Sequence, residues 1–445
     1  MSKAKIGFIS LGCPKNQTDT EIMIKLLTDA GYVIAAEDID ADIIVINTCA
    51  FIESAKKEAI ENILDVAWLK ENRSLKGIVV TGCLPERYRE EVLESMPEVD
   101  ALLGVNSIHD IVKAVRSIEN KSKVKYTSFR RYDELELGGN RVLTTQGGFA
   151  YLKIAEGCDN RCTYCAIPNI RGPFRSRPME DIIKEAKYLE KQDIKEIVII
   201  AQDTTRYGED LYGEYKLAEL IHKLTEETKT PFFRLLYCYP DKITDDLIEE
   251  YKSNPRLIKY IDLPIQHIND EILRKMNRHG GSEVIKDAIR RLRTVEGMII
   301  RSTVITGFPG ESEEQFEELC DFIIETKFDR LGAFAYSREE GTPAYMLDNQ
   351  IDEQTKQDRA DKIMERQAEI SAEKNQRMLS KIVKVICEGY DVVSESYFGR
   401  SYADAPEIDG KIYFQSPDVR RNIGEFLDVE IIDTLDYDLI GEALI

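Results

Sequence analysis

The chain has 445 residues, of which 43% are hydrophobic and 32% are charged, a composition typical of a soluble globular protein with two or three domains. Its apolar runs fall short of the roughly 18 residues that cross a membrane, so no membrane span is expected. The net charge of −21 disfavours a broad nucleic-acid-binding face, because contacts to phosphate groups require Lys and Arg. It favours either a basic partner or simple solubility.

The first segment, MSKAKIGFISLGC, has a short apolar run that predicts a strand. It lacks the longer apolar region and the small-residue cleavage site of an export signal, so we expect a cytoplasmic protein. In that reducing compartment, the nine cysteines are predicted to be metal ligands or free thiols rather than disulfides.

Residues 1–120 alternate between strand patterns and amphipathic helix patterns, which predicts an α/β domain with a mostly parallel sheet. Strands are predicted at KIGFISLGC, ADIIVINTC and KGIVVTGC. Helices are predicted at TDTEIMIKLLTDAG, SAKKEAIENILDVAWLK, PERYREEVLESM and SIHDIVKAVRSIE, with Ser54 as the N-cap of the second. From 121 to 143 the alternation stops, and we expect a linker there.

Residues 144–373 show a second alternation. Strands are predicted at YLKIAEGC, EIVIIAQD, FFRLLYCYP, YIDLPIQH, IIRSTVITGFPG and RLGAFAYS, and amphipathic helices follow the first five. This pattern predicts a partial (β/α)6 barrel, in which the working residues lie where strands end. After a long charged helix, residues 376–445 change to short alternating strands. They predict a small antiparallel β-barrel of OB-like size.

Three cysteines, Cys158, Cys162 and Cys165, lie within eight residues in the stretch EGCDNRCTYCAIPN. Buried thiols acting as small hydrophobic residues are one reading. A zinc site is another, although zinc prefers four protein ligands in paired spacing. The tight spacing favours a third, a 4Fe–4S cluster held by three thiolates, with one iron left open.

This motif, directly after the first strand of a predicted barrel and with an aromatic residue at Tyr164, resembles the radical S-adenosylmethionine (SAM) family. The resemblance implies that the amino and carboxylate groups of SAM chelate the open iron. Reductive cleavage of SAM then gives a 5′-deoxyadenosyl radical that abstracts hydrogen. The cofactor carries this chemistry, and the protein orients it and excludes water.

Another three cysteines, Cys13, Cys49 and Cys83, each follow a predicted parallel strand. Because the carboxyl ends of parallel strands meet at one edge of a sheet, these thiols are expected to converge there. They are either a second set of cluster ligands or unrelated strand-end cysteines. The remaining three, Cys238, Cys320 and Cys387, follow no such pattern and are expected to be buried structural thiols.

Two three-cysteine sets followed by a small barrel resemble the methylthiotransferases, over essentially the whole chain. The resemblance implies an auxiliary 4Fe–4S cluster on the N-terminal domain, a radical SAM core and a C-terminal TRAM domain. It also implies that inserted sulfur is associated with the auxiliary cluster. One SAM would supply the methyl group and another the radical.

Two branches of that family differ in substrate. MiaB-like enzymes modify an adenosine base of tRNA, and RimO-like enzymes modify the β-carbon of an aspartate in small-subunit ribosomal protein S-twelve, giving 3-methylthioaspartate. Pro14 and Lys15 in SLGCPKN, Asp203 and Thr204 in AQDTTRYG, and His267 in DLPIQHIND resemble the RimO-like branch. This resemblance implies S-twelve as partner, on its own or in the small subunit, and makes tRNA an unexpected one.

Charge supports the same branch independently. Residues 381–445 hold 14 Asp and Glu against 6 Lys and Arg, a net charge of −8. A barrel that binds tRNA is expected to be basic, whereas an acidic one attracts a basic protein. An acidic surface kept only for solubility is the alternative. One departure from the branch is Gln17-Thr18 after PKN, which lies beyond the ligand.

Further candidate residues lie near predicted strand ends. SAM contacts are expected from Gly307, Pro309 and Gly310 in TGFPGE, and from Gln202. TGFPGE is equally well read as a plain strand-to-helix turn. Asp203 and His267 are candidate substrate contacts, and a structural hydrogen-bonding role is the alternative for His267.

Three arginines, Arg171, Arg175 and Arg177, follow the cysteine motif. They are read either as partners of the SAM carboxylate or the substrate, or as solvated surface residues.

Three function hypotheses remain at this point. The favoured one is an S-twelve methylthiotransferase with two 4Fe–4S clusters, SAM and an external electron donor. The others are a tRNA methylthiotransferase and a non-catalytic iron–sulfur or zinc protein acting as a redox sensor or adaptor. No hydrophobic heptads predict a coiled coil, so we expect a monomer.

Overall fold

A computed structural model describes residues 3–122, 124–134, 137–145, 147–416 and 420–444. The chain forms two compact units. Unit 1 comprises Met1–Thr144, Ala155–Arg177 and Ser337–Tyr345, and unit 2 comprises Thr145–Ile154, Pro178–Tyr336 and Met346–Ile445. Across the described residues, every helix is too short or too polar to span a membrane.

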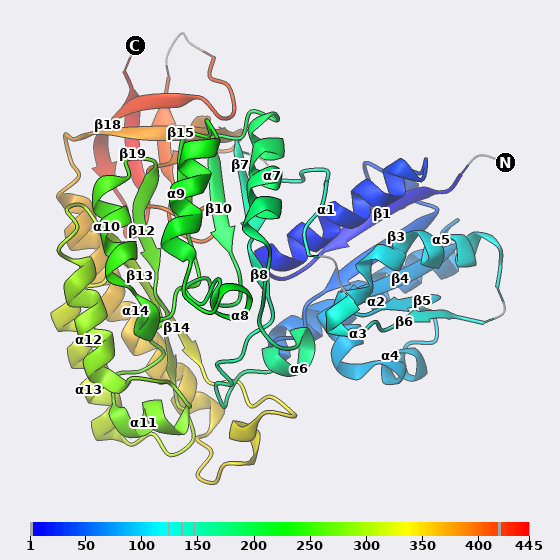
Figure 1. Ribbon diagram of the computed structural model, residues 1–445, viewed down its shortest axis with the longest axis horizontal. Helices are drawn as coiled ribbons and strands as arrows, with labels where there is room; N and C mark the ends of the chain where they lie inside the picture. Colours follow the sequence, from blue (N-terminus) through cyan, green and yellow to red (C-terminus); the bar gives the residue numbers. More distant parts are fainter. Residues whose placement is uncertain (1–2, 123, 135–136, 146, 417–419, 445) are drawn as a thin grey trace. The chain divides into compact units, whose positions relative to one another are not determined.

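Unit 1 is built on the predicted parallel sheet, which the structure confirms (Figure 1). Its strands follow the order β2 (Val33–Ile34), β1 (Lys5–Ser10), β3 (Ile43–Thr48), β4 (Gly77–Gly82), β5 (Ala101–Leu103) and β6 (Tyr126–Ser128). The central strands β3 and β4 are buried along their whole length, as expected for a sheet covered on both faces. Strand β6 lies inside residues 121–143, which the sequence predicts to be a linker. Its three residues are too few to show the alternation that identifies a strand.

Helices cover both faces of this sheet, and alternate residues of β3 pack into different cores. Ile44 and Ile46 join one hydrophobic cluster, and Ile43 and Val45 join the other. The helices are α1 (Pro14–Asp29), α2 (Glu53–Asn72), α3 (Cys83–Tyr88), α4 (Glu90–Ser95) and α5 (Ile111–Glu119), and the later segments of unit 1 add β8 (Ala155–Glu156), α6 (Ile167–Arg171) and β9 (Arg175–Ser176).

Two local predictions in this unit are wrong. Ser54 is not the N-cap of α2, because that helix begins at Glu53 and Ile52 occupies the cap position. The stretch PERYREEVLESM does not form one helix. It forms α3 and α4, which are separated at Arg89, where a φ of 47° is incompatible with a right-handed helix.

Unit 2 begins with a second parallel sheet, and every predicted barrel strand is present. Their order is β14 (Arg330–Ala335), β13 (Ile299–Thr306), β12 (Leu257–Asp262), β11 (Phe232–Leu235), β10 (Glu196–Ile200) and β7 (Phe149–Lys153). The helices are α7 (Met179–Glu190), α8 (Glu209–Tyr212), α9 (Leu217–Glu227), α10 (Asp245–Ser253), α11 (Asp270–Lys275), α12 (Gly281–Leu292), α13 (Glu313–Thr326) and α14 (Glu353–Gln376). Consecutive strands are neighbours, as in an open (β/α) barrel.

The C-terminal segment of unit 2 forms a closed five-strand barrel, as the sequence predicts. Its strands are β15 (Ile382–Asp391), β16 (Ser396–Arg400), β17 (Ile412–Gln415), β18 (Phe426–Thr434) and β19 (Leu439–Ala443). The barrel is not antiparallel throughout, because β17 and β19 pair in parallel. Its core is aliphatic and aromatic, with Val385, Phe414 and Val429 fully buried.

Buried ion pairs join this small barrel to the first strands of the larger one, within unit 2. Glu196 on β10 accepts hydrogen bonds from Arg234 Nε at 2.5 Å and Arg400 Nη1 at 2.7 Å, and Arg400 Nε also binds Glu388 at 2.6 Å. Burial alone would raise the pKa of Glu196, but the two arginines hold it below its usual value. The carboxylate therefore stays charged inside the protein.

Replacing Arg400 by Met is expected to lower the free energy of unfolding by about 3–5 kcal/mol, because it leaves buried Glu196 with one arginine partner instead of two and removes the arginine partner of half-buried Glu388. Urea denaturation at pH 7 measures the change. The control is Lys384→Met in the same barrel. Lys384 and Asp428 form an exposed pair, with side chains 60% and 54% accessible. Losing such a pair costs about 1 kcal/mol or less.

The difference between wild type and Arg400→Met is expected to shrink in acid. A carboxyl group with a lowered folded-state pKa stabilises the fold above its unfolded pKa and stops doing so as the pH falls through the folded value. Equal losses for the Arg400 and Lys384 variants at pH 7 would contradict this account.

Candidate metal centre

The first cysteine set lies at the carboxyl ends of three neighbouring strands. Cys13 follows β1, Cys49 follows β3 directly, and Cys83 begins α3 immediately after β4. Cys49 and Cys83 are buried and Cys13 is half-buried. Burial raises the pKa of Cys49, and it raises that of Cys83 to about 12, with further contributions from the neighbouring thiols. The three cysteines therefore lie at the carboxyl ends of neighbouring strands, at one edge of the sheet, as the sequence predicts.

Two glycines allow the strand-end loops to approach so closely. Gly12 has a φ of +89°, and a Cβ there would lie 2.7 Å from Cys49 Cβ. Gly82 has a φ of +96°, and its Cβ would lie 2.5 Å from the carbonyl oxygen of Thr48. Both positions demand a left-handed backbone and leave no space for a side chain.

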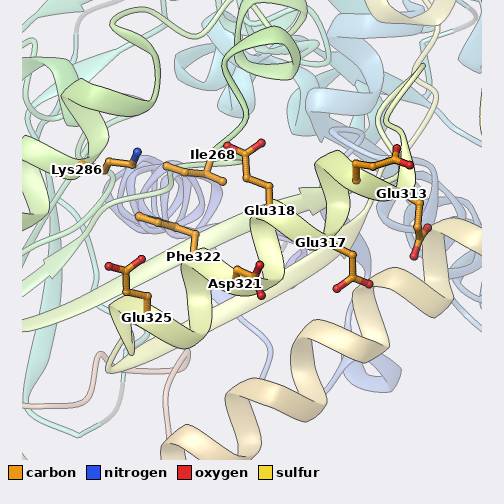
Figure 2. Close-up of a pocket in the computed structure, with 9 residues that line it drawn as sticks. Ile268, Lys286, Glu313, Glu317, Glu318, Asp321, Phe322 and Glu325 are labelled. Carbon is orange, nitrogen blue, oxygen red and sulfur yellow. The ribbon is translucent and has the colours of Figure 1, made fainter.

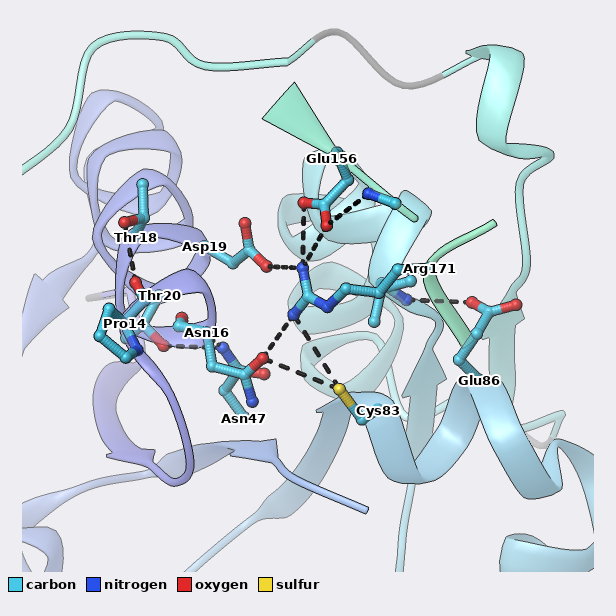
Figure 3. A network of polar contacts seen from close by, with 12 residues as sticks. Pro14, Asn16, Thr18, Asp19, Thr20, Asn47, Cys83, Glu86, Glu156 and Arg171 are labelled. Carbon is cyan, nitrogen blue, oxygen red and sulfur yellow. Dashed lines mark hydrogen bonds and ion pairs between the residues drawn. The ribbon is translucent and has the colours of Figure 1, made fainter. Parts of the chain in front are cut away.

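Asn16, fully buried in the first turn of α1, joins the loops that carry the three cysteines. Its Nδ2 donates to the carbonyl oxygens of Leu11, at 3.0 Å, and Thr48, at 2.9 Å. Its Oδ1 lies 3.9 Å from Cys83 Sγ, which donates to it. One amide therefore contacts the chain before Cys13, the residue before Cys49, and Cys83 itself. Figure 3 shows its contact with Cys83.

The guanidinium of Arg171 completes this network (Figure 3). Its Nη2 donates to Asn16 Oδ1 at 2.5 Å and lies 4.0 Å from Cys83 Sγ. Its Nη1 contacts both carboxylate oxygens of Glu156 at 3.0 Å and Asp19 Oδ2 at 3.3 Å. Burial alone would lower the pKa of Arg171, but Glu156, Cys83 and Asp19 raise it well above the usual value.

The reading of the post-motif arginines as solvated surface residues is wrong for Arg171 and Arg177, which are 1% and 2% exposed. Arg171 contacts the first cysteine set instead. Sequence reasoning missed this role, and it missed Asn16 altogether. The available signal was the position of Asn16 three residues after Cys13, because a short polar side chain in the first turn of a helix is well placed to bond the preceding loop.

The donor chemistry of the first set fits an iron–sulfur cluster. Among the described residues, no three Cys, His, Asp or Glu side chains are close enough to hold a single metal ion. A four-iron cluster is wider than one ion, so its thiolate ligands stand further apart, and thiolates are its usual ligands. The buried cation beside Cys83 compensates part of the negative charge that thiolates and a cluster would bring.

The second set, Cys158, Cys162 and Cys165, also belongs to unit 1, on the segment Ala155–Arg177. The loop is held by its own backbone. The amide of Cys158 donates to the Gly172 carbonyl at 3.1 Å, and that of Cys165 to the Cys162 carbonyl at 3.0 Å. Cys162 is buried and the other two thiols are half-buried. Both sets are therefore parts of one compact unit.

The loop Ser337–Tyr345 strengthens this unit by contacting both cysteine-bearing regions. Glu339 pairs with Arg87 at 2.8 Å and accepts from the amide of Glu53 at 2.8 Å. The amide of Ala344 donates to the carbonyl of Thr163, inside the three-cysteine motif, at 2.9 Å.

The other candidate residues lie in unit 2, at or after the ends of its strands. Gln202 is half-buried, and Asp203 is buried and accepts a hydrogen bond from Thr205 Oγ1 at 2.6 Å. His267 is fully buried, with Nδ1 accepting from the Asn269 amide at 2.9 Å and Nε2 lying 3.1 Å from Glu311 Oε1. This pattern agrees with a structural role for His267, and its contact with a substrate stays a prediction.

Glu311 in turn holds the turn TGFPGE. Its Oε2 accepts from the amide of Gly307 at 2.7 Å and from Arg359 Nη1 at 2.6 Å. Gly307 and Gly310 have φ values of +69° and +76°, so the turn needs both glycines for its backbone. Binding of SAM by Gly307, Pro309 and Gly310 stays a prediction.

Outside the two sets, Cys238, Cys320 and Cys387 are buried, as the sequence predicts. A surface groove of about 550 Å³ lies along α13 in unit 2 (Figure 2). Carboxylates dominate its lining, which consists of Ile268, Lys286, Glu313, Glu314, Glu317, Glu318, Asp321, Phe322 and Glu325. The acidic charge of the chain is thus concentrated on at least one helix face as well as in the C-terminal barrel.

Comparison with known proteins adds to this geometry. "Ribosomal protein uS12 methylthiotransferase RimO" from Acetivibrio thermocellus is 47% identical over 449 residues, covering 99% of both chains. The protein of the same name from Clostridium tetani is 48% identical over 443 residues, covering 99% of this chain and 98% of the other. The chain belongs to the uS12 methylthiotransferase family. It is a radical SAM methylthiotransferase.

Three family models match in the order that the sequence predicts. They are "Uncharacterized protein family UPF0004" at residues 5–104, "Radical SAM superfamily" at 152–323 and "TRAM domain" at 381–444. A solved structure of the radical SAM methyltransferase TsrM from Kitasatospora setae has a TM-score of 0.59 and 13% identity, covering 77% of each chain. That likeness supports the fold.

Replacing Gly82 by Ala is expected to destabilise the fold by about 1–3 kcal/mol, because the new Cβ meets Asn47 and Thr48 and the backbone is left-handed. Thermal unfolding of the apoprotein measures the loss. Gly213→Ala is the control, since Gly213 has a φ of +78° but open space around its Cβ. Equal losses at both positions would show that crowding between the cysteine loops contributes nothing.

Proposed function

We propose that this chain inserts a methylthio group at the β-carbon of an aspartate of ribosomal protein uS12 (S-twelve), giving 3-methylthioaspartate. The observation that carries the proposal is the full-length similarity, at 47–48% identity, to relatives that are named for this reaction. Both three-cysteine sets in one compact unit support it, because the reaction needs a radical source and a sulfur source.

In this proposal, Cys158, Cys162 and Cys165 hold the cluster that binds SAM, and Cys13, Cys49 and Cys83 hold the auxiliary 4Fe–4S cluster. When bound, the clusters and SAM supply the electron transfer, the hydrogen-abstracting radical, the sulfur and the methyl group. The chain supplies thiolates in fixed loops, and burial that keeps water from Cys49 and Cys83. An external electron donor, a cytoplasmic location and a monomeric state complete the proposal.

The residues at the strand ends of unit 2 have the remaining roles. We assign Gln202, Gly307, Pro309 and Gly310 to SAM, because backbone without side chains allows a ligand to approach closely. Asp203 is assigned to the substrate side, and His267 is assigned to it indirectly, through its contact with Glu311. Since both ring nitrogens of His267 are hydrogen-bonded, its contribution is to hold Glu311 and the turn at Gly307.

The charge distribution supports a basic protein substrate over tRNA. The chain carries a net charge of −21, the C-terminal barrel segment carries −8, and the groove along α13 is lined by carboxylates. Such surfaces repel a phosphate backbone and attract the Lys- and Arg-rich surface of a ribosomal protein. A non-catalytic adaptor role is disfavoured because the radical SAM motif is complete.

A competition assay without oxygen tests the substrate. The chain, with both clusters reconstituted, receives SAM, a reductant and sulfide, together with a peptide spanning the uS12 aspartate and undermodified tRNA. Mass spectrometry is expected to find the methylthio group on the peptide. A methylthio group on tRNA would overturn the substrate assignment. If SAM is cleaved but neither the peptide nor the tRNA is modified, the uS12 substrate assignment is wrong and only the radical SAM activity is supported.

Single cysteine variants test the division of labour. Cys162→Ala is expected to abolish reductive SAM cleavage, measured as 5′-deoxyadenosine. Cys83→Ala is expected to retain SAM cleavage while losing methylthiolation of the peptide. Cys320→Ala, a buried thiol outside both sets, serves as the control and should keep both activities. Full methylthiolation by the Cys83 variant would contradict the auxiliary-cluster assignment.

A further inference from the structure

We propose that Arg171 is a positioning residue for the auxiliary cluster, which it serves by orienting Asn16 and by placing a buried positive charge beside Cys83. The inference rests on the proposed function in that it needs Cys13, Cys49 and Cys83 to hold a cluster. Arg171 lies on the segment Ala155–Arg177, which carries the other cysteine set. The two sets are then linked by one guanidinium.

Asn16 lies between two of the ligand loops. The side-chain NH₂ group of Asn16 donates both of its hydrogens to backbone carbonyls, those of Leu11 and Thr48. These two residues flank the loops of Cys13 and Cys49. A third hydrogen bond, from Asn47 Nδ2 to the backbone carbonyl of Asn16 at 2.8 Å, joins the start of α1 to the end of β3. The amide thereby fixes the distance between two ligand loops before any cluster is present.

The contact with both loops depends on the orientation of the Asn16 amide. Because an amide has one accepting and one donating end, it holds the two loops only when its NH₂ group faces them. Arg171 Nη2 donates to the Oδ1 end at 2.5 Å, and a guanidinium has no acceptor for an NH₂ group. The arginine therefore selects the orientation in which Asn16 binds Leu11 and Thr48.

Arg171 also contributes a buried positive charge. Arg171 Nη2 lies 4.0 Å from Cys83 Sγ, and its partners Asp19 and Glu156 are both buried. Without the guanidinium, the buried carboxylates of Asp19 and Glu156 would each lose a cationic partner, and the thiolate that a cluster requires at Cys83 would lose the positive charge beside it. With it, negative charge at the cluster is partly compensated, which favours the reduced, more negative form of the cluster.

Arg171 belongs to the short helix α6, which follows the second cysteine set. Arg171 ends α6, six residues after Cys165, and Ile170 of the same helix packs in the hydrophobic cluster of unit 1. Helix α6 therefore connects the loop of the second cysteine set to the network around the first set. Disturbing α6 is expected to affect both.

The test uses the full-length chain with Cys158, Cys162 and Cys165 all changed to Ala, so that bound iron reports on the auxiliary set alone. In this background, Arg171→Gln, Arg171→Lys and Asn16→Ala are compared after anaerobic reconstitution at limiting iron and sulfide. Iron and sulfide per chain, and the reduction midpoint potential followed by electron paramagnetic resonance, are the readouts. Neither depends on turnover.

Arg171→Gln is expected to weaken cluster loading by roughly 10-fold to 100-fold, the range typical when a hydrogen-bonding partner of a metal ligand is removed. The residual cluster should have a more negative midpoint potential. Arg171→Lys, which keeps the charge without the planar fork, should restore the potential more fully than the loading. Asn16→Ala should lower loading while leaving the potential nearly unchanged.

Arg141→Gln provides the matched control. Arg141 is 1% exposed and pairs with buried Glu21 in the same unit, so its loss perturbs the fold without removing the charge beside Cys83. Arg141→Gln should keep the background loading and potential. Equal losses for the Arg141 and Arg171 variants, or an Arg171→Gln variant that loads and titrates like the background, would overturn the proposal.

A background protein that takes up no iron would also overturn it. That result would locate the failure in the auxiliary-cluster assignment itself, and so in the proposed function. Normal loading of the background with an unaffected Arg171→Gln variant would locate the failure in the role of Arg171 alone.

Discussion

A buried guanidinium that contacts two carboxylates, an amide and a thiol is the interaction on which the candidate metal centre depends. Arg171 reaches Asp19, Glu156, Asn16 and Cys83, and its contacts join helices and strands that are up to 155 residues apart in the chain. Burying a single charge is very costly unless it is paired and hydrogen-bonded, so the unit must bring all these partners together for the fold to be stable. The same requirement places the auxiliary cysteine loops.

The parallel sheet supplies the rest of the geometry. Its strand order puts the ends of β1, β3 and β4 side by side, which delivers three cysteines from positions 36 and 34 residues apart to one edge. The left-handed glycines at positions 12 and 82 then let the loops approach to contact distance. The fold therefore determines the candidate ligand set: the aliphatic strands form a rigid sheet, and the cysteines lie at the ends of its strands. The segment with the second cysteine set is part of this same unit.

Much of this was predictable from the sequence. Long aliphatic runs such as IIVINT and GIVVTG predict parallel strands. The cysteines that follow these strands are therefore predicted to lie at the same edge of the sheet. Strands of two or three residues, such as β2 and β6, show no period and were missed. The single helix expected at PERYREEVLESM failed because the left-handed backbone at Arg89 has no signal in residue type. For Arg171 the sequence left a SAM or substrate contact and a solvated surface position open, and neither is its buried contact with Asn16 and Cys83, because burial of a charge depends on partners that are distant in the chain and converge only in the fold.

Locating the iron atoms directly would test the central claim, that Cys13, Cys49 and Cys83 form a second cluster site organised by Arg171. The measurement is a crystal structure of the anaerobically reconstituted chain, with anomalous scattering recorded at the iron edge. We expect two separate iron peaks, one bounded by Cys158, Cys162 and Cys165 and the other by Cys13, Cys49 and Cys83, with the Arg171 guanidinium still in contact with Asn16 and Cys83. A single peak at the first set, or a second peak with Arg171 turned away from Cys83, would contradict it.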